Sequence, residues 1–313
     1  MNSDGFATAL APAKVNTSLV ILAKRDDGFH ELQTQMVCLE LSDTVRARAR
    51  ADGAISLSVT GPAASTDIPC DESNLVWRAA RAWLDLHGES RGVDLELTKN
   101  VPSQAGLGGG SSDAAAAILA CSETLQLPLH DAHLEAQLAA LGSDCVFFGS
   151  AGTTGAAWCE GRGERVTPKA APAPAWHVSI VVPDVQVATS AVYSALELSL
   201  GGPRDLPRLN PEVLQLVATA ARHWLINDLE LPALESFPEL RAWRNLLDRT
   251  GRAHYCLAGS GATFFGLFDS HAAASESTRV ITESAQASGL SMRASFVTRT
   301  VSHAAQLMPA DSD

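Results

Sequence analysis

The sequence predicts a two-domain protein that mixes helices and strands. Residues 15–59 read mostly as strands, and apolar residues alternate with polar ones at 45–49 and 55–59. A region of helices and strands follows around a glycine-rich loop. A second such region begins after a proline-containing stretch at 170–175, which is typical of a linker. At 313 residues the chain is long enough to form two cores.

Composition and charge indicate the class of protein. Hydrophobic residues make up 46% of the chain and charged residues 19%, as in ordinary soluble globular proteins. Apolar runs such as 178–182 are too short to cross a bilayer, and residues 1–10 lack the features of a signal peptide. We therefore expect a cytoplasmic protein without a membrane partner. The net charge of −12 argues against a nucleic-acid partner, although a local basic cleft could still bind a phosphorylated molecule.

The six cysteines are scattered along the chain, with no Cys-x-x-Cys pair and no set of histidines nearby. This pattern excludes the common zinc spacings and favours buried free thiols. We therefore name no metal-ligating side chain.

In the N-terminal region, strands are expected at residues 15–23, 29–41, 45–49, 55–59 and 93–97. Asp52-Gly53 lies between two alternating runs and predicts a hairpin that pairs 45–49 with 55–59. Ser73 is the expected N-cap of a helix that ends at Gly88, and a shorter helix is expected at about 131–141.

The most informative stretch, residues 101–119, joins a glycine-rich loop to an alanine-rich helix. Four glycines between residues 106 and 110 permit positive φ angles, and residues 111–113 are expected to cap the helix. Such a loop directs unpaired amides and the positive end of the helix dipole at one place, which suits phosphate. A flexible turn is the alternative interpretation. The spacing fits neither the lysine-containing phosphate loop nor the dinucleotide-binding fingerprint.

In the C-terminal region, strands are expected at 178–182 and 293–298, and helices at 189–200, 212–221, 239–250 and 280–288. A second glycine turn, within residues 257–268, leads into a strand. It is therefore not expected to bind phosphate at a helix start.

Three motifs in the same order, residues 11–16, 102–112 and 258–264, resemble the GHMP kinase superfamily, which includes galactokinase, homoserine kinase and mevalonate kinase. Within it, Arg-Asp-Asp-Gly-Phe-His-Glu-Leu-Gln at 25–33 is similar to the signature of the kinases that act on 4-diphosphocytidyl-2-C-methyl-D-erythritol. The resemblance covers about residues 12–301.

The resemblance implies an α+β fold of two domains. Residues 1–168 would form the N-terminal ATP-binding and catalytic domain, which is ribosomal protein S5 domain 2-like. Residues 169–313 would form a ferredoxin-like C-terminal domain. The substrates are expected between them.

The resemblance also implies a reaction, in which ATP phosphorylates the 2-hydroxyl of 4-diphosphocytidyl-2-C-methyl-D-erythritol in non-mevalonate isoprenoid biosynthesis. By matched position, Lys14 and Asp144 would be the catalytic pair. Asp144 would accept the hydroxyl proton, and Lys14 would orient the hydroxyl and offset the charge on the transferred phosphoryl group. Without the resemblance, Lys14 reads as a surface lysine and Asp144 as a cap or turn residue.

The resemblance assigns ATP and Mg²⁺ to the glycine-rich loop and its surroundings. The loop residues expected to bind ATP are Pro102, Ala105, Gly106, Leu107, Gly108, Gly109, Gly110, Ser111 and Ser112. The hydroxyls of Ser111 and Ser112 could bind phosphate or magnesium. Lys99 and Asn74 match positions near the adenine.

The partner implied is a small molecule with a cytidine diphosphate group, assigned to Asn16, Phe29, His30 and Tyr193. Phe29 and Tyr193 would stack on the base, and such stacking contributes about 1–3 kcal/mol elsewhere. His30 would read the edge of the cytosine, whereas its ordinary interpretation is a strand histidine with a partner in the protein. Phe29 stands where the family usually has tyrosine.

Two alternatives remain open. The chain could be another GHMP kinase, acting on a mevalonate-like, homoserine or sugar hydroxyl, but the aromatic residues argue against this because such substrates carry no base. It could also be a nucleotide-binding homologue without activity, but Lys14 and Asp144 are both retained. A monomer or a homodimer is expected.

Overall fold

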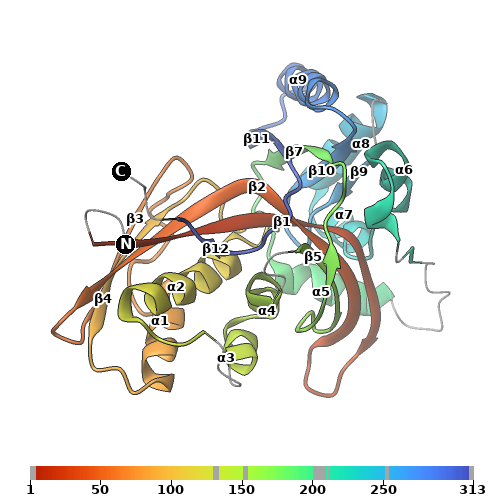
Figure 1. The fold of residues 1–313 in the computed structure, drawn as a ribbon. Coiled ribbons are helices and arrows are strands. Elements are labelled where there is room, and N and C mark those ends of the chain that lie inside the picture. Colours follow the sequence, from red (N-terminus) through yellow and green to blue (C-terminus); the bar gives the residue numbers. More distant parts are fainter. Residues whose placement is uncertain are drawn as a thin grey trace.

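The structure is a computed structural model that describes residues 5–129, 134–150, 154–199, 209–210, 212–250 and 254–309. It contains two sheets that lie side by side, each covered by helices (Figure 1).

The first sheet is built on two long antiparallel strands, β1 (Ala7–Lys24) and β2 (His30–Arg50). Its path β12-β1-β2-β4-β3 is completed by β12 (Gln306–Leu307), β4 (Gly92–Thr98) and β3 (Ile55–Thr60). Off this path, β5 (Gly155–Gly161) pairs with β2, β6 (Arg165–Ala170) with β5, and β8 (Ile226–Asn227) with β1. The predicted strands 29–41 and 45–49 are thus parts of one strand, β2.

The predicted hairpin around Asp52-Gly53 is wrong. β3 pairs in parallel with β4, and β4 lies between β3 and β2. The chain can pass from β2 over to β3 because Gly92, at the start of β4, has no side chain. A Cβ atom there would lie 1.9 Å from the carbonyl oxygen of Ala54. The residues of the turn therefore predicted that the chain changes direction after β2, but not that β4 lies between β2 and β3.

The helices that cover one face of the first sheet are α1 (Leu75–Leu86), α2 (Gly109–Leu125), α3 (Leu134–Leu141) and α4 (Ser143–Ser150) (Figure 1). The small side chains of α2 at residues 114–117 are all buried in the core, so this helix packs closely on β1 and β2. The start of the helix predicted at 131–141 lies outside the described residues. The rest corresponds to α3, and α4 was not predicted.

The second sheet has the antiparallel order β11-β7-β10-β9, formed by β7 (His177–Pro183), β9 (Tyr255–Leu257), β10 (Phe264–Phe268) and β11 (Met292–Arg299). Helices lie between β7 and β9 and between β10 and β11, which makes the arrangement ferredoxin-like, as predicted. These helices are α5 (Thr189–Ser199), α7 (Glu230–Ser236), α8 (Pro238–Thr250) and α9 (His271–Ala287).

The helix predicted at 212–221 is broken. The structure has short 3-10 helices at Val213–Gln215 and Arg222–Trp224 with a four-residue helix, α6 (Ala218–Ala221), between them. Leu216 takes an extended conformation, and its carbonyl oxygen accepts a hydrogen bond from the buried indole of Trp176 at 2.8 Å. A tertiary contact thus replaces the continuous helix.

The two sheets share part of their core. One apolar cluster joins Val15 and Val37 of the first sheet to Ile180 and Phe265 of the second. The domain boundary predicted at residue 168 falls inside β6, just before the chain enters the second sheet, and remains a prediction. Among the described helices, none combines the length and the apolar character needed to cross a membrane.

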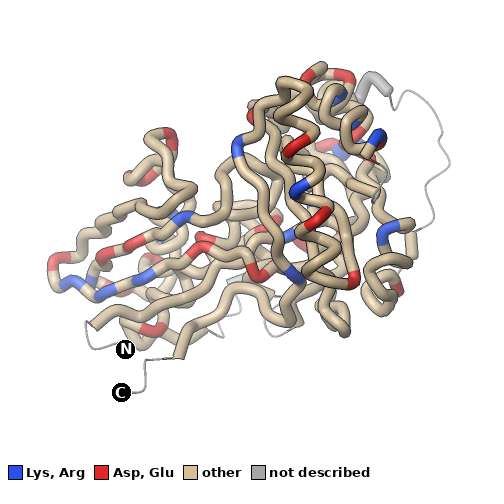
Figure 2. Tube along the Cα trace, turned by 90° about the horizontal axis from the view of Figure 1, so that it is seen from above, with Lys and Arg blue, Asp and Glu red and all other residues tan. Residues whose placement is uncertain are grey.

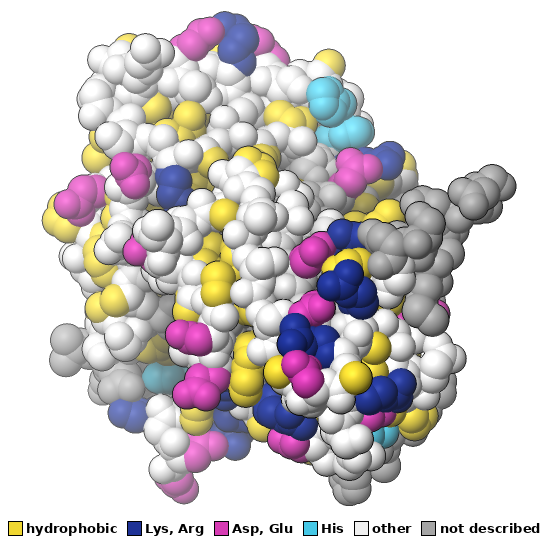
Figure 3. Space-filling model, turned by 90° about the vertical axis from the view of Figure 1, so that its left-hand side faces the viewer, with side chains coloured by type: hydrophobic (Ala, Val, Ile, Leu, Met, Phe, Trp, Pro, Cys, Tyr) yellow, Lys and Arg dark blue, Asp and Glu magenta, His cyan; other side chains and the backbone are white. Residues whose placement is uncertain are grey.

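Charges of both signs are interspersed on the first sheet. Arg46 on β2 lies 2.6 Å from Glu96 on β4, and Asp94 contacts both Arg48 and Arg50. Figure 2 shows basic and acidic residues close to one another on these neighbouring strands. On the face seen in Figure 3, basic and acidic side chains likewise lie next to one another. Such exposed pairs contribute at most about 1 kcal/mol each, so they mainly keep this surface solvated.

Candidate active site

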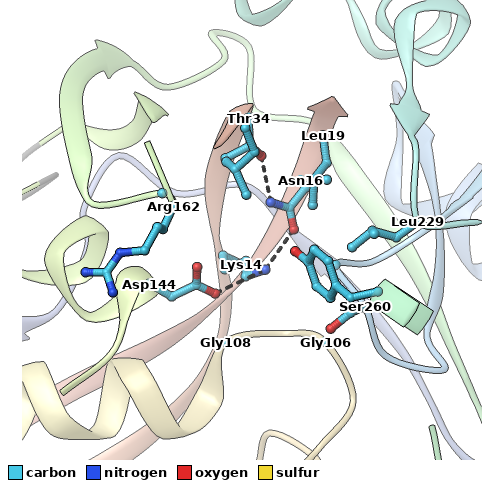
Figure 4. A pocket seen from close by; sticks show the side chains of 14 residues that line it. Lys14, Asn16, Leu19, Thr34, Gly106, Gly108, Asp144, Arg162, Leu229 and Ser260 are labelled. Atoms are coloured by element: carbon cyan, nitrogen blue, oxygen red, sulfur yellow. Dashed lines mark hydrogen bonds and ion pairs between the residues drawn. The ribbon is translucent and has the colours of Figure 1, made fainter. Parts of the chain in front are cut away.

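A cavity of about 160 Å³ opens where the loops of the two sheets meet (Figure 4). Its lining comes from β1, β2, the glycine-rich loop, the start of α4, the β5–β6 turn, α5 and two loops of the C-terminal region. The lining residues are Lys14, Asn16, Leu19, Leu32, Thr34, Gly106, Gly108, Asp144, Arg162, Gly163, Tyr193, Leu229, Gly259 and Ser260.

The predicted catalytic pair meets in this cavity. Lys14 Nζ on β1 lies 3.4 Å from Asp144 Oδ2, and the dashed line in Figure 4 marks this contact. The Lys14 side chain is 5% exposed and that of Asp144 is 35% exposed, so a ligand can reach the carboxylate while the lysine stays enclosed. Asp144 lies in the first turn of α4, where the helix dipole favours a negative charge.

A chain of hydrogen bonds holds the lysine in place. Lys14 Nζ donates to Asn16 Oδ1 at 2.7 Å, and Asn16 Nδ2 donates to Thr34 Oγ1 at 2.8 Å. The Thr34 hydroxyl in turn donates to the carbonyl oxygen of Ser18 at 2.6 Å. Lys14 and Asn16 point the same way because they are two residues apart on one strand. Asn16, predicted to bind substrate, thus also positions the ammonium group.

The glycine-rich loop starts α2 earlier than predicted. Gly108 is the N-cap, with the left-handed φ of 73°, and the helix begins at Gly109. Residues 111–113 therefore lie within the helix, and the prediction that they cap it is wrong. Because a glycine cap has no side chain, the amides of the first turn keep no side-chain acceptor and remain available to a ligand. This is the arrangement that binds phosphate at helix starts.

The second glycine turn packs directly against this loop. A Cβ atom on Gly106 would lie 2.0 Å from the carbonyl oxygen of Ala258, and one on Gly261 would lie 2.5 Å from the carbonyl carbon of Ala105. Asn227 Nδ2 donates to the carbonyl oxygens of Leu257 and Gly259, at 2.9 and 2.7 Å. The turn leads into β10, a strand, as predicted.

The remaining loop residues line or support the same region. Leu107 accepts a backbone hydrogen bond from the Lys14 amide at 2.9 Å, which joins the loop to β1. Within the loop, Pro102 and Ala105 are buried, whereas Gly110 is exposed. Ser111 is partly exposed, and Ser112 Oγ is fully buried without a hydrogen-bond partner among the described residues.

These features fit the phosphates of ATP, because first-turn amides and a buried hydroxyl can donate to phosphate oxygens. The described residues contain no cluster of three or more His, Cys, Asp or Glu side chains that could hold a metal ion.

Two residues predicted near the adenine make contacts within the protein. Asn74, not Ser73, is the N-cap of α1: its Oδ1 accepts from the Val76 amide at 2.9 Å, and its Nδ2 donates to the carbonyl oxygen of Pro69 at 2.7 Å. The prediction of Ser73 as the cap is therefore wrong by one residue. Ser73 instead donates through its hydroxyl to Asp71 at 2.6 Å.

Lys99 is buried between two carboxylates. It is 3% exposed and forms ion pairs with Asp43 and with Asp113, the second at 2.6 Å. Neither partner was predicted from the sequence. Asp43 gave no signal because it lies within a strand, and Asp113 was interpreted as a cap.

The residues predicted to bind the base are only partly brought together. The rings of His30 and Tyr193 lie 4.9 Å apart at an angle of 35°, and Tyr193 lines the cavity. Phe29 lies in the β1–β2 turn with 52% of its surface exposed, and the Arg162 guanidinium carbon lies 4.7 Å from its ring centre. Arg162 was not among the predicted site residues.

Burial controls the acidity of Tyr193. Removal of its phenol from water raises its pKa to about 12, and the negative charge of Asp144 acts in the same direction. The Tyr193 hydroxyl therefore stays protonated and can donate a hydrogen bond at neutral pH.

The structure has a ferredoxin-like sheet beside a helix-covered sheet, and a glycine-rich helix start next to a lysine–aspartate pair. Together these features define the class of GHMP kinases. The sequence profile of the GHMP kinases N terminal domain matches residues 74–155, and that of the GHMP kinases C terminal domain matches residues 205–285. Among curated proteins, the chain is 39% identical over 282 residues to a 4-diphosphocytidyl-2-C-methyl-D-erythritol kinase of Geobacter metallireducens, covering 88% of this chain and 94% of that one. A protein of the same name from Deinococcus radiodurans is 38% identical, with 82% of each chain covered.

Solved structures agree. A crystal structure of 4-(cytidine 5'-diphospho)-2C-methyl-D-erythritol kinase superposes with a TM-score of 0.74 at 31% identity, covering 94% of this chain and 98% of that one. A homoserine kinase from Cytophaga hutchinsonii superposes with a TM-score of 0.72 at 16% identity, with 98% and 99% covered, which shows a shared fold. The chain belongs to the 4-diphosphocytidyl-2-C-methyl-D-erythritol kinase family of GHMP kinases. It is an ATP-dependent small-molecule kinase.

Proposed function

We propose that this protein transfers the γ-phosphoryl group of ATP to the 2-hydroxyl of 4-diphosphocytidyl-2-C-methyl-D-erythritol. The observation that carries the proposal is the position of Asp144, 3.4 Å from the enclosed Lys14 ammonium and in one cavity with Gly106 and Gly108 of the glycine-rich loop. A carboxylate that removes a proton must lie next to the site of phosphoryl transfer, and this geometry supports that role.

In the proposed step, the proton of the substrate hydroxyl passes to a carboxylate oxygen of Asp144. The hydroxyl oxygen forms a bond to the γ-phosphorus while the bond from that phosphorus to the β,γ-bridging oxygen breaks, which leaves ADP. Lys14 orients the hydroxyl and offsets the negative charge on the transferred group. Asn16 holds Lys14 for this task through the hydrogen bond from the ammonium group.

The glycine-rich loop is proposed to bind the ATP phosphates through its first-turn amides, with Ser111 and Ser112 as additional donors. Mg²⁺, when bound, would neutralise charge on the phosphates, and the serine hydroxyls are the groups on this chain that could hold it there. Ser112 Oγ, which is buried and has no hydrogen-bond partner within the described part of the chain, supports such a ligand contact.

The cytidine group is proposed to contact Tyr193, His30 and Phe29. Support comes from the Tyr193 side chain in the cavity lining and from its contact with the His30 ring. Phe29 could reach a bound base from the exposed turn, where Arg162 now covers its ring. We further propose a cytoplasmic protein, a monomer or homodimer, with its domain boundary near residue 168.

The test is a coupled ADP-release assay with 4-diphosphocytidyl-2-C-methyl-D-erythritol, mevalonate and homoserine as acceptors. Asp144→Asn is expected to lower kcat by 10²-fold or more, the scale typical of losing a general base, while the KM for ATP changes little. His30→Ala should instead raise the KM for the cytidyl substrate. Turnover of mevalonate or homoserine in place of the cytidyl substrate would refute the proposed substrate. A fully active Asp144→Asn variant would refute the role of the carboxylate.

A further inference from the structure

A charged cluster lies buried directly beneath the start of α2. Lys99, Asp43 and Asp113 are 3%, 0% and 2% exposed, and both carboxylates contact the one ammonium group. These residues come from three segments of the chain: the residue that follows β4, the middle of β2 and the second turn of α2.

The cluster touches the glycine-rich loop at both of its ends. Before the loop, Asp43 Oδ1 accepts hydrogen bonds from the backbone amides of Asn100 and Val101, the second at 2.8 Å. After the loop, a Cβ atom on Gly109 would lie 3.2 Å from Lys99 Nζ and 3.5 Å from Asp43 Oδ2. The charged atoms therefore lie against the first turn of the helix whose amides face the phosphate site.

The charges in the cluster do not balance when both carboxylates are ionised, because two acids share one ammonium group. Burial raises the pKa of Asp113 well above its usual range; Lys99 opposes this effect and Asp43 adds to it. Burial lowers the pKa of Lys99, but Asp113 and Asp43 outweigh that and raise it overall, so the lysine stays charged. Removing the lysine charge would leave buried negative charge next to a site for polyphosphate.

We propose that Lys99 is a positioning residue that acts as the counter-ion of Asp43 and Asp113 and thereby lets the glycine-rich loop accept phosphate. This proposal rests on the ATP site described above and refines the role of Lys99 within it. Lys99 was expected near the adenine. Its ammonium group is instead directed at two carboxylates under the loop.

The two roles make different predictions. A lysine that contacts adenine contributes equally to the binding of ADP and adenosine, because both carry the base. A counter-ion under the phosphate loop contributes to ADP but not to adenosine, because only ADP carries phosphates. Neutralising one carboxylate should also compensate for loss of the counter-ion, and it would not restore a contact with the base.

The experiment is calorimetric titration of ADP and of adenosine into the wild-type protein, Lys99→Met, Asp43→Asn and Lys99→Met/Asp43→Asn. Lys169→Met, which removes a charge from an exposed position of β6, is the matched control. Lys99→Met is expected to weaken ADP binding on the order of tenfold, because a charge acts on the phosphates over several ångströms in partly polar surroundings. Adenosine binding should weaken by less than about twofold. The double variant should recover most of the ADP affinity, and Lys169→Met should bind as wild type.

Equal losses of ADP and adenosine affinity in Lys99→Met would overturn the proposal, as would a double variant no better than the single one. If Lys99→Met does not fold, Asp43→Asn decides alone: unchanged or tighter ADP binding is expected, and weaker ADP binding contradicts the proposal. Because neither ligand contains methylerythritol, the result does not depend on which alcohol the enzyme phosphorylates.

Discussion

The close contact between the two glycine turns leads to a prediction about Gly106→Ala. Gly106 has a φ of 81°, which alanine adopts only under strain, and a Cβ atom there would lie 2.0 Å from the carbonyl oxygen of Ala258. The nearest atoms to the new methyl group belong to the backbone of Ala258 and Gly261. The overlap therefore cannot be relieved by rotating a side chain, and the turn at 258–261 must move.

Two terms set the magnitude. The left-handed conformation costs alanine about 1–2 kcal/mol. Inserting a methyl group into a well-packed place costs about 1–3 kcal/mol more. We therefore expect Gly106→Ala to lower the free energy of unfolding by about 2–5 kcal/mol. The displaced turn includes Gly259, whose position borders Lys14 Nζ, so the KM for ATP and kcat should both worsen.

Gly289→Ala is the matched control. Gly289 has a similar φ of 70°, but a Cβ atom there would meet nothing within 4 Å. This variant should show only the conformational cost of about 1–2 kcal/mol and should keep its activity. The assay is equilibrium urea unfolding of both variants, with kinase rates measured in parallel. Equal destabilisation of the two variants would refute the reasoning, because it would mean that the two turns are not in tight contact.

Three further predictions concern other contacts of the site and fold. Asn16→Ala should lower kcat more than it changes either KM, because Lys14 loses its 2.7 Å acceptor; a change confined to the KM of the cytidyl substrate would instead favour direct substrate binding. Asn74→Ala should lower the free energy of unfolding in urea by about 1 kcal/mol, because α1 loses its cap. Ser73→Ala should lower it by less, and a larger loss for Ser73→Ala than for Asn74→Ala would place the cap at Ser73. The pKa of Tyr193 rises from 10.0 unfolded to about 12 folded, so its protonated form contributes stability that is complete below pH 10 and is lost as the pH rises towards 12. Tyr193→Phe should therefore lose less stability than wild type across this pH window in urea unfolding, and identical pH profiles would contradict the pKa shift.

Much of the architecture could be predicted from local patterns. The glycine-rich loop, the alanine-rich helix after it and the strands at 178–182 and 293–298 carry clear short-range signals, and the structure has elements at each place. Two of the predictions that failed concern places where a distant segment decides the outcome. The first is the predicted hairpin, which does not form because β4 lies between β2 and β3. The second is the helix predicted at 212–221, which is broken where the Trp176 indole donates a hydrogen bond to the carbonyl oxygen of Leu216.

The sequence by itself determined the family, the class of reaction and the identity of the lysine and aspartate that lie in the cavity. Motifs preserve residue types in a fixed order, so these conclusions need no coordinates. Only the tertiary structure placed Lys14 beside Asp144 and enclosed Lys99 between Asp43 and Asp113. Each of these sites joins segments far apart in the chain. The burial that sets their charge states depends on everything packed around them, which no local pattern records.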